Sequence, residues 1–281
     1  MKISGKTNIT GIFGYPVKHT FSPSMHNAGF ENLGIDFVYI PFEVKPEALN
    51  AAVKGIKAQN IRGVNITIPH KQAVIKYIDN IDPLAKKIGS VNTIVNTNGR
   101  LTGYNTDGAG FLKDLIEHKV NPKGKVVMLL GAGGAGRSVA CTLSFHGTKK
   151  ILISDKDEKK AKTLAQSVKN AVYIPFKSFQ DKIKESSILI NATPIGMREG
   201  DPSPVKENYL HKDLFIYDVI YNTKTMLLKT SEKKKLKSCN GLGMLLYQGV
   251  LAFEKWTNKK APVKTMKKAL EANIYSENKE R

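Results

Sequence analysis

Cysteine is scarce in this chain of 281 residues, which contains only Cys141 and Cys239. Two cysteines cannot build a disulfide scaffold, and neither lies in a Cys-x-x-Cys pair or in a Cys/His cluster with the spacing of metal ligands. The sequence therefore predicts two buried thiols in a reducing compartment and no bound metal.

Long hydrophobic runs are also missing, since no stretch approaches about 18 apolar residues, and Met1 to Thr10 lack the apolar core of a secretion signal. These absences favour the cytoplasm and no membrane partner.

Acidic residues are few, because 24 Asp and Glu face 44 Lys and Arg, which gives a formal net charge of +20. Such a surplus could indicate a nucleic-acid partner, an anionic membrane surface, or only a lysine-rich solvated exterior. The lysines are scattered singly, with short runs only at 159–160, 233–235, 259–260 and 267–268, and no aromatic side chains are interleaved as stacking platforms. We therefore predict no nucleic-acid partner and a positive field that helps to draw in an anionic substrate.

Short apolar runs rich in Val and Ile alternate with helical patterns along almost the whole chain, which is typical of a parallel sheet covered by helices. The predicted fold class is α/β. In the N-terminal part we expect strands at 9–15, 37–41, 64–68 and 93–95, and helices after Ser22, Pro46 and Pro83. The Asn98-Gly99 pair indicates a hairpin turn into a further strand at 100–103.

A second, regular series of strands and helices begins near residue 105. We expect its strands at 125–130, 151–153, 172–174, 188–190 and 215–220. Two more helical patterns, at 244–256 and 262–274, follow this series. Periodicity alone does not say onto which domain these two helices pack.

A glycine-rich turn, Gly131-Ala132-Gly133-Gly134-Ala135-Gly136, directly follows an apolar strand and precedes a helical stretch that begins near Ser138. In this context Gly131 permits a tight turn, Gly133 lets backbone amides approach a pyrophosphate, and Gly136 allows the helix to pack close to the strand. The partial positive charge of the helix N-terminus would stabilise the bound anion. The turn predicts a dinucleotide site, and the alternative is a strand-to-helix turn without a ligand.

The end of the next strand bears on the choice of cofactor. An acid at this place binds the adenosine ribose hydroxyls of NAD, whereas basic groups receive the 2′-phosphate of NADP. This chain has Asp155-Lys156-Asp157 there. Asp155 would repel a phosphate at short range, and Lys156 could pair with one, so both cofactors stay open on this evidence.

Short segments spread over essentially the whole chain resemble, in order, motifs of the shikimate dehydrogenase family. Any one of them could arise by chance, but the set in the right order is hard to explain otherwise. The segments are His19-Thr20-Phe21-Ser22-Pro23, Asn65 to Lys71, Gly89 to Thr93, Gly103 to Gly108, the glycine-rich turn, Asn191 to Met197, Asp218 to Tyr221 and Gly241 to Gly249.

The resemblance implies a substrate-binding catalytic domain, residues 1–105 with 244–281, and a doubly wound Rossmann-type dinucleotide-binding domain, residues 106–243, with a cleft between them. The implied activity is that of an oxidoreductase, the reversible NADP-dependent reduction of 3-dehydroshikimate to shikimate in chorismate and aromatic amino-acid biosynthesis. The nearest alternative is a quinate/shikimate dehydrogenase that uses NAD. A non-catalytic nucleotide- or nucleic-acid-binding module is an alternative of another class, and the chain could be a monomer or a homodimer.

The resemblance assigns catalysis to Lys71 and Asp107. Lys71 would take the proton from the reacting hydroxyl, and Asp107 would orient that hydroxyl and pair with the lysine. An ordinary lysine, with a pKa of about 10.4, is a poor base at neutral pH, and a neighbouring carboxylate would raise that value whereas burial would lower it. Taken alone, Lys71 would be a solvated cation and Asp107 a helix N-cap.

Shikimate carries a carboxylate and three hydroxyls, so its site needs short hydroxyl and amide groups. The resemblance places the carboxylate on Thr20 and Ser22, and because the family more often has serine at the first position, the choice between shikimate and quinate stays open. The other substrate-binding positions that it implies are Asn65, Thr67, Lys71, Asn92, Asp107, Tyr221 and Gln248.

The cofactor-binding positions that it implies are Gly131, Ala132, Gly133, Gly134, Ala135, Asp155, Lys156, Thr193, Ile220 and Gly241. The family usually has Asn-Arg-Thr where this chain has Asp155-Lys156-Asp157. A lysine offers only a point charge where the arginine would clamp the 2′-phosphate with two hydrogen bonds. We predict NADP as the cofactor and expect appreciable use of NAD.

Overall fold

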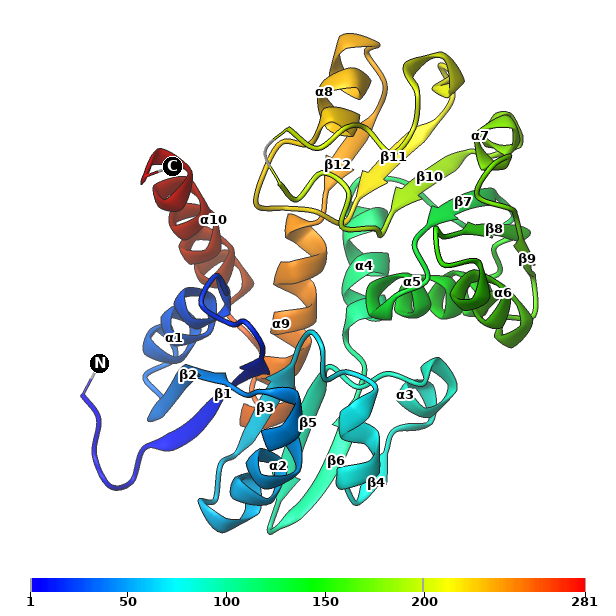
Figure 1. Ribbon diagram of the computed structural model, residues 1–281. Helices are drawn as coiled ribbons and strands as arrows, with labels where there is room; N and C mark the ends of the chain where they lie inside the picture. The colour runs from blue at the N-terminus through cyan, green and yellow to red at the C-terminus, as the bar shows by residue number, and fades with distance from the viewer. Residues whose placement is uncertain (1, 199, 281) are drawn as a thin grey trace. The chain divides into compact units, whose positions relative to one another are not determined.

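The computed structural model describes residues 2–198 and 200–280. Two compact units make up the chain, one formed by Met1–Thr106 with Leu246–Arg281 and the other by Asp107–Leu245. Each unit contains its own six-stranded sheet (Figure 1). No helix among the described residues is long and apolar enough to cross a membrane.

The sheet of the first unit has the strand order β2-β1-β3-β5-β6-β4. Its strands are β1 (Asn8–Gly14), β2 (Phe37–Glu43), β3 (Gly63–Ile66), β4 (Asn80–Ile81), β5 (Thr93–Thr97) and β6 (Arg100–Tyr104). The first three are parallel to one another, and β5 is antiparallel to β3 and to β6. The predicted hairpin is confirmed, because Thr97 pairs with Arg100 and both turn residues between them have positive φ. The expected strand at 64–68 ends earlier, at Ile66, three residues before Pro69, which has no N–H to donate to a ladder.

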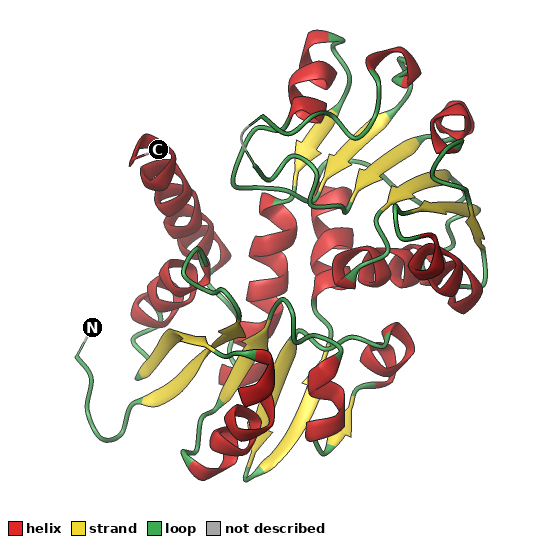
Figure 2. Cartoon of the chain, in the orientation of Figure 1, coloured by secondary structure: helices red, strands yellow, loops and turns green. Residues whose placement is uncertain are grey.

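Helices cover this sheet and include the last two of the chain. They are α1 (Ser22–Asn32), the 3-10 turn η1 (Pro46–Ala48), α2 (Leu49–Ala58), the 3-10 turn η2 (Ala73–Tyr77), α3 (Pro83–Ile88), most of α9 (Leu242–Thr257) and α10 (Val263–Glu280). α10 packs against α1 (Figure 2). On α9, the buried Trp256 donates from Nε1 to the carbonyl of Ile94 in β5, at 3.0 Å. The structure therefore settles which unit these helices join, which the sequence pattern left open.

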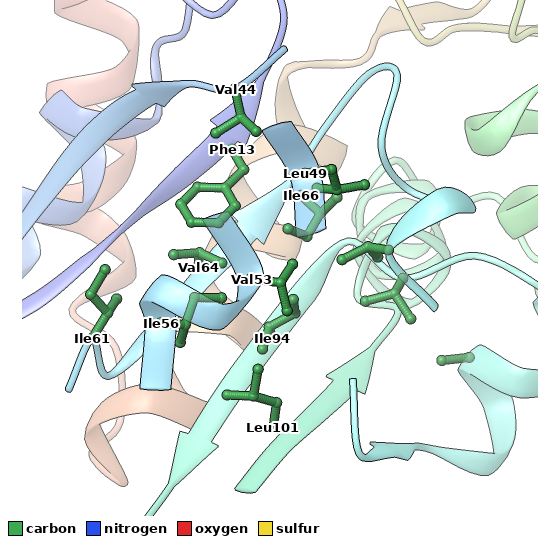
Figure 3. Close-up of a cluster of buried hydrophobic side chains, with 13 residues drawn as sticks. Phe13, Val44, Leu49, Val53, Ile56, Ile61, Val64, Ile66, Ile94 and Leu101 are labelled. Atoms are coloured by element: carbon green, nitrogen blue, oxygen red, sulfur yellow. The ribbon is translucent and has the colours of Figure 1, made fainter. Parts of the chain in front are cut away.

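One core cluster of the first unit fills the space between α2 and the sheet (Figure 3). Val53 and Ile56 of α2 face Val64, Ile94 and Leu101 of the strands, and none of the five is more than 1% exposed. Burying each such side chain stabilises the fold by about 1.5–3 kcal/mol. This packing holds the ends of β3 and β5 rigidly in place.

An aromatic cluster lies between α1, β2 and α9. The His26 ring stacks on Tyr39 with 4.4 Å between ring centroids and lies 5.3 Å from Trp256. Both ring nitrogens of His26 are buried and have no hydrogen-bond partner among the described residues. Burial lowers the pKa of His26 from 6.5 to about 3, so the ring stays neutral in the folded protein.

This buried histidine predicts a loss of stability in acid. In the unfolded chain His26 is protonated below about pH 6.5, whereas in the folded chain it stays neutral down to about pH 3. The free energy of unfolding therefore falls as the pH drops through that window. Between pH 7 and pH 5 we expect His26 alone to cost about 2 kcal/mol of unfolding free energy, at 1.36 kcal/mol per pH unit. Urea unfolding of the parent chain and of His26→Phe at both pH values measures this difference. Equal pH dependence of the two proteins would show that the histidine does not titrate in this way.

The sheet of the second unit is entirely parallel, with the order β12-β11-β10-β7-β8-β9. Its strands are β7 (Val126–Leu130), β8 (Lys150–Ser154), β9 (Ala171–Tyr173), β10 (Ile188–Asn191), β11 (Phe215–Asp218) and β12 (Ser238–Asn240). Its helical segments are α4 (Asp107–Glu117), α5 (Gly134–Phe145), α6 (Glu158–Ser167), α7 (Phe179–Lys182), η3 (Ile183–Glu185), η4 (Glu207–Tyr209) and α8 (Met226–Lys233).

The strand order of this sheet reverses between β7 and β10, because the chain runs outward from β7 through β8 to β9 and then returns to β10 on the other side. This is the order of a doubly wound dinucleotide-binding fold, in which ligands bind beside the carboxyl ends of the strands at the reversal. The predicted α/β class is confirmed. The expected strand at 215–220 ends at Asp218, because the N–H of Ile220 donates to the Asp218 carboxylate instead of to a neighbouring strand.

Candidate functional site

The loop after β3 carries Lys71 and is anchored on both sides. His70, which is 1% exposed, makes a 2.6 Å hydrogen bond from Nε2 to the carbonyl of Val44. The carbonyl of Lys71 accepts a hydrogen bond from the N–H of Val91, at 2.8 Å. The Lys71 residue is half-buried. Sequence reasoning missed His70, which fixes the backbone from which the Lys71 side chain extends.

Asn92 is the centre of a buried polar network in the first unit. Its Oδ1 accepts from the backbone N–H of Thr106 at 2.7 Å, and its Nδ2 donates to Thr106 Oγ1 at 2.9 Å and to Gln248 Oε1 at 3.3 Å. None of the three residues is more than 8% exposed. The network therefore joins α9 to the end of β6, where the chain enters the second unit.

Asn65 extends this network toward α1. Its Nδ2 donates to the Asn92 carbonyl and to Thr93 Oγ1, and its Oδ1 accepts from the Tyr39 hydroxyl at 2.8 Å. Burial raises the pKa of Tyr39 well above its usual range, although a hydrogen bond with Ser22 acts in the opposite direction. The phenol therefore stays protonated and serves as a donor.

The network ends near the start of α1. Ser22, the first residue of this helix, is buried, and its N–H donates to Oγ1 of the half-buried Thr20, with a long separation of 3.4 Å. Thr67, also half-buried, lies just beyond β3. Five predicted substrate residues of the first unit, Thr20, Ser22, Asn65, Asn92 and Gln248, thus belong to one continuous polar network. Sequence reasoning assigned no role to Tyr39, Thr93 and Thr106. Thr93 and Thr106 lie within two of the motif segments, and Tyr39 lies in the strand expected at 37–41.

Asp107 is the first residue of α4 and is 5% exposed. The helix begins at Asp107 itself, so the cap position is that of Thr106, and the carboxylate lies in the first turn, where the helix dipole stabilises a negative charge. Tyr221, the other substrate residue predicted in the second unit, is half-buried and lies beyond the end of β11.

The glycine-rich turn between β7 and α5 requires glycine at two positions. Gly131 has a φ of +101°, and a Cβ there would lie 2.6 Å from the carbonyl oxygen of Ala192. A Cβ on Gly136 would lie 2.0 Å from the Gly131 carbonyl oxygen, so helix and turn touch through backbone alone. By contrast, a Cβ on Gly133 would meet no described atom within 4 Å. The tight turn and close helix approach that the sequence predicted are confirmed, and the turn is open at Gly133.

Two features of α5 suit an anionic ligand. The helix N-cap is Gly133, and no described side chain caps the first turn, so backbone amides there have no side-chain acceptor. Arg137, in the second half of that turn, has a buried Nε with no hydrogen-bond partner among the described residues. A buried guanidinium N–H without a partner is costly, and a bound anion would satisfy it. Sequence reasoning did not single out Arg137.

The Asp155 carboxylate links the glycine-rich turn to the loop after β8. Its Oδ2 accepts from the N–H of Ala132 at 2.7 Å, and its Oδ1 accepts from the N–H of Asp157 at 2.8 Å. Asp157 caps α6, accepting from the N–H of Lys160 at 3.1 Å, and this hydrogen bond lowers the pKa of the Asp157 carboxyl. Lys156 between them is exposed. The structure therefore holds the Asp155 carboxylate against the turn in a fixed orientation.

A second buried network holds the ends of β10 and β11. Asn191 accepts at Oδ1 from the Thr193 hydroxyl at 2.6 Å and donates from Nδ2 to Asp218, and Asp218 accepts from the Thr225 hydroxyl at 2.7 Å. Burial raises the pKa of the Asp218 carboxyl, and the hydrogen bonds from Thr225, the Ile220 N–H and Asn191 act against this rise. The network fixes Thr193 and Ile220 just beyond the two strand ends. Gly241 is also fixed there, because its N–H donates to the Ile220 carbonyl.

The predicted cofactor residues thus gather at the carboxyl ends of neighbouring parallel strands, on both sides of the reversal in strand order. The predicted substrate residues divide between the units, with Asp107 and Tyr221 in the second and the others in the first. Among the described residues of the second unit, the first turn of α5 has amides without a side-chain cap, and the buried Nε of Arg137 has no hydrogen-bond partner. The first unit contains the fixed hydroxyl and amide groups and the predicted catalytic Lys71.

Two glycines of the turn allow stability and ligand binding to be separated. We expect Gly136→Ala to lower the unfolding free energy by about 1–3 kcal/mol, because the new methyl group would overlap the Gly131 carbonyl. Gly133→Ala has room and should leave the unfolding free energy within about 0.5 kcal/mol, yet weaken dinucleotide binding about tenfold because the methyl group occupies the open face of the turn. Urea unfolding and fluorescence titration with NADPH measure the two quantities. Unchanged NADPH affinity in Gly133→Ala would show that the turn is not part of the dinucleotide-binding site.

Comparisons with known proteins agree with these features. Three family models match the chain: shikimate dehydrogenase substrate binding domain at residues 12–94, shikimate/quinate 5-dehydrogenase at residues 114–198, and shikimate 5′-dehydrogenase C-terminal domain at residues 241–271. A shikimate dehydrogenase (NADP(+)) of Desulforamulus reducens is 44% identical, over 97% of this chain and 98% of its own.

Two solved structures of shikimate dehydrogenases are also similar to this chain over nearly its whole length. A shikimate dehydrogenase in complex with NADP+ is 40% identical with a TM-score of 0.92, over 97% of this chain and 98% of its own. A shikimate 5-dehydrogenase of Listeria monocytogenes, in complex with shikimate and NAD, is 38% identical with a TM-score of 0.89, over 96% of this chain and 98% of its own.

Proposed function

The chain belongs to the shikimate dehydrogenase family, and we propose that it catalyses the reversible NADP(H)-dependent reduction of 3-dehydroshikimate to shikimate, a step in chorismate biosynthesis. The observation that carries this proposal is the polar network of the first unit, which links Thr20 and Ser22 through Tyr39 and Asn65 to Asn92 and Gln248. Such a set of fixed hydroxyl and amide groups suits a small acid with several hydroxyls. The proposed assembly is a monomer or a homodimer.

In this proposal Thr20 and Ser22 bind the substrate carboxylate through their hydroxyls, next to the start of α1. Asn65, Thr67, Asn92, Tyr221 and Gln248 bind the ring hydroxyls. The side-chain amides of Asn65 and Asn92 are already held by hydrogen bonds with neighbouring side-chain and backbone groups. Because these groups are oriented before substrate arrives, little conformational entropy is lost on binding.

Lys71 moves the proton of the reacting hydroxyl. It removes this proton when shikimate is oxidised and returns it to the carbonyl oxygen when 3-dehydroshikimate is reduced. Asp107 orients the hydroxyl. The hydrogen bonds of His70 and of the Lys71 carbonyl hold the lysine-bearing loop, so that the amine reaches the substrate with few alternative positions.

The residues of the second unit fit a nicotinamide dinucleotide, which supplies or accepts the hydride when bound. Gly131, Ala132, Gly133, Gly134 and Ala135 would hold its pyrophosphate, because the turn is open at Gly133 and the first turn of α5 is uncapped. Thr193, Ile220 and Gly241 would contact its nicotinamide half, and Asp155 with Lys156 its adenosine half. NADP is the proposed cofactor, and NAD is a second candidate because of the Asp155 carboxylate.

We further propose residues 1–105 with 244–281 as the substrate-binding catalytic domain and residues 106–243 as the dinucleotide-binding domain. A reducing compartment, the cytoplasm, suits the two buried thiols Cys141 and Cys239.

A spectrophotometric assay of nicotinamide reduction with shikimate and with quinate, each with NADP and NAD, tests the proposal. We expect turnover of shikimate with NADP, and kcat/KM for shikimate above that for quinate. Preference for quinate would instead support the broader quinate/shikimate dehydrogenase, which the methyl group of Thr20 leaves open. No reduction of either nucleotide by either acid, in a chain shown to be folded by circular dichroism, would contradict the proposal.

A further inference from the structure

Three side chains of metal-ligand type converge in the second unit, outside the proposed substrate and cofactor positions. They are Asp114 and His118 of α4 and Cys239 of β12, and one ligand atom of each lies within 4.8 Å of the other two. Neither the spacing of the cysteines nor any histidine motif in the sequence indicated this cluster. Two separate features of the fold bring it together.

The first feature is helical periodicity. Residues four apart lie on one face of a helix, and His118 Nε2 is accordingly 3.6 Å from Asp114 Oδ1. The second feature is the sheet, because β12 pairs with β11 and places Cys239 beside Tyr217. The Tyr217 hydroxyl in turn donates to Asp114 Oδ2 at 2.6 Å. Strand pairing and one buried hydrogen bond therefore connect the cysteine to the carboxylate.

The cluster has a buried side and an open side. The side chain of Asp114 is 6% exposed and Cys239 is 9% exposed, whereas the His118 side chain is 44% exposed. An ion could enter past the imidazole, and a water molecule could complete its coordination there. The buried side places two ligand atoms in a setting of low dielectric constant, where a ligand in its charged form attracts a cation strongly.

The Asp114 carboxylate is oriented by its surroundings. The hydrogen bond from Tyr217 fixes Oδ2, and Oδ1 is the atom that faces His118. A Cβ on Gly243 would lie 1.9 Å from Oδ1, so glycine at this position makes room for the carboxylate. Hydrogen-bonded outer groups of this kind are typical of metal sites, where they orient the ligands.

We propose that Asp114, His118 and Cys239 bind one Zn²⁺ ion, with water as the fourth ligand. A thiolate, an imidazole and a carboxylate are the ligands that zinc takes in proteins, at about 2.0–2.3 Å and in tetrahedral geometry. Two ligand atoms bound to such an ion lie roughly 3.2–3.8 Å apart. The ligand atoms of this cluster lie within 4.8 Å of one another, so the most distant pair must approach by about 1 Å when the ion binds. Binding releases the thiol proton of Cys239 to solvent, and no redox change is involved. The proposal does not depend on the proposed dehydrogenase activity.

Titration of the full chain with Zn²⁺ alone tests the site, after removal of bound metal with a chelator and in competition with a zinc-binding dye. We expect one ion per chain, and a loss of affinity of about tenfold or more in His118→Ala and in Cys239→Ser. Cys141→Ser and His146→Ala are matched controls, because they remove the same groups elsewhere in this unit, and they should bind zinc as the parent does. Co²⁺ should show a thiolate charge-transfer absorption band that Cys239→Ser lacks.

Three outcomes would overturn the proposal. They are no stoichiometric binding by the parent chain, equal affinity in parent and His118→Ala, and a thiolate band that survives in Cys239→Ser. If Cys239→Ser fails to fold, the zinc affinity of His118→Ala alone tests the proposal. The His118 side chain is exposed, so its removal leaves the buried packing intact.

Discussion

Replacing Lys71 by alanine is expected to lower kcat at least ~100-fold while leaving the affinity for shikimate almost unchanged, because the variant loses the proposed proton-transfer group but none of the polar network proposed to bind the ring. Steady-state kinetics with shikimate and NADP give kcat, and equilibrium binding of shikimate gives the affinity separately. The two measurements together distinguish a catalytic lysine from one that only attracts the substrate carboxylate.

Lys76→Ala is the matched control for this experiment. It removes the same charge from the same stretch of chain, but Lys76 is exposed and its amine lies over the ring of Tyr77. We expect near-normal kcat. If Lys71→Ala kept more than about a tenth of the parent kcat, a loss far smaller than general acid–base catalysis supplies, another residue or solvent would have to carry the proton.

Asp155→Asn is expected to raise the ratio of kcat/KM for NADP over that for NAD about 30-fold, which corresponds to about 2 kcal/mol. The carboxylate is held against the glycine-rich turn by the N–H groups of Ala132 and Asp157, so it cannot swing away from a 2′-phosphate. Asparagine has the same shape but only one acceptor oxygen, so the change removes the negative charge and also leaves one of these two backbone N–H groups without its acceptor. The kinetics of both cofactors with saturating shikimate measure the ratio.

The control for this charge effect is Asp157→Asn. Asp157 is only two residues away and carries the same charge, but its carboxylate caps α6 and pairs with Lys160 at 3.2 Å. Asparagine caps helices about as well as aspartate, so we expect only a small change in the ratio. A parent ratio already above about 100, or equal effects of the two substitutions, would show that Asp155 does not set the choice between the cofactors.

Several parts of the fold were predictable because their signals are local. Alternating apolar strands and helical patterns located the main elements of both sheets. The helix expected from Ser138 is α5, but it begins four residues earlier, at Gly134 within the glycine-rich turn. The turn works as a signal because Gly131 has a positive φ and a Cβ on Gly136 would overlap the Gly131 carbonyl, although the backbone that a Cβ on Gly131 would meet belongs to the distant Ala192. Two very short strands, β4 and β12, were missed, since they are two and three residues long and have no periodicity to detect, whereas the equally short β9 was predicted at 172–174.

The hydrogen-bond networks of the candidate site were also not predictable from local sequence signals. The resemblance of the motifs indicated Asn65, Asn92 and Gln248, but not that Tyr39, Thr93 and Thr106 hold two of them in one network, because these contacts join residues far apart in the chain. The partners of Asp155 were also not predictable. Its charge is evident from the sequence, whereas its orientation depends on two backbone amides in two different loops.

By itself, the sequence determined the α/β class, the positions of the main strands along the chain and the position of the glycine-rich turn. These follow from hydrophobic periodicity and from the backbone freedom of glycine, which act over a few residues. The tertiary structure alone decided that α9 and α10 complete the first unit, that the Asp155 carboxylate lies on the turn, and that Asp114, His118 and Cys239 meet. These depend on how elements distant in the sequence pack, and packing is set by the shapes of whole surfaces, which no local pattern of residues specifies.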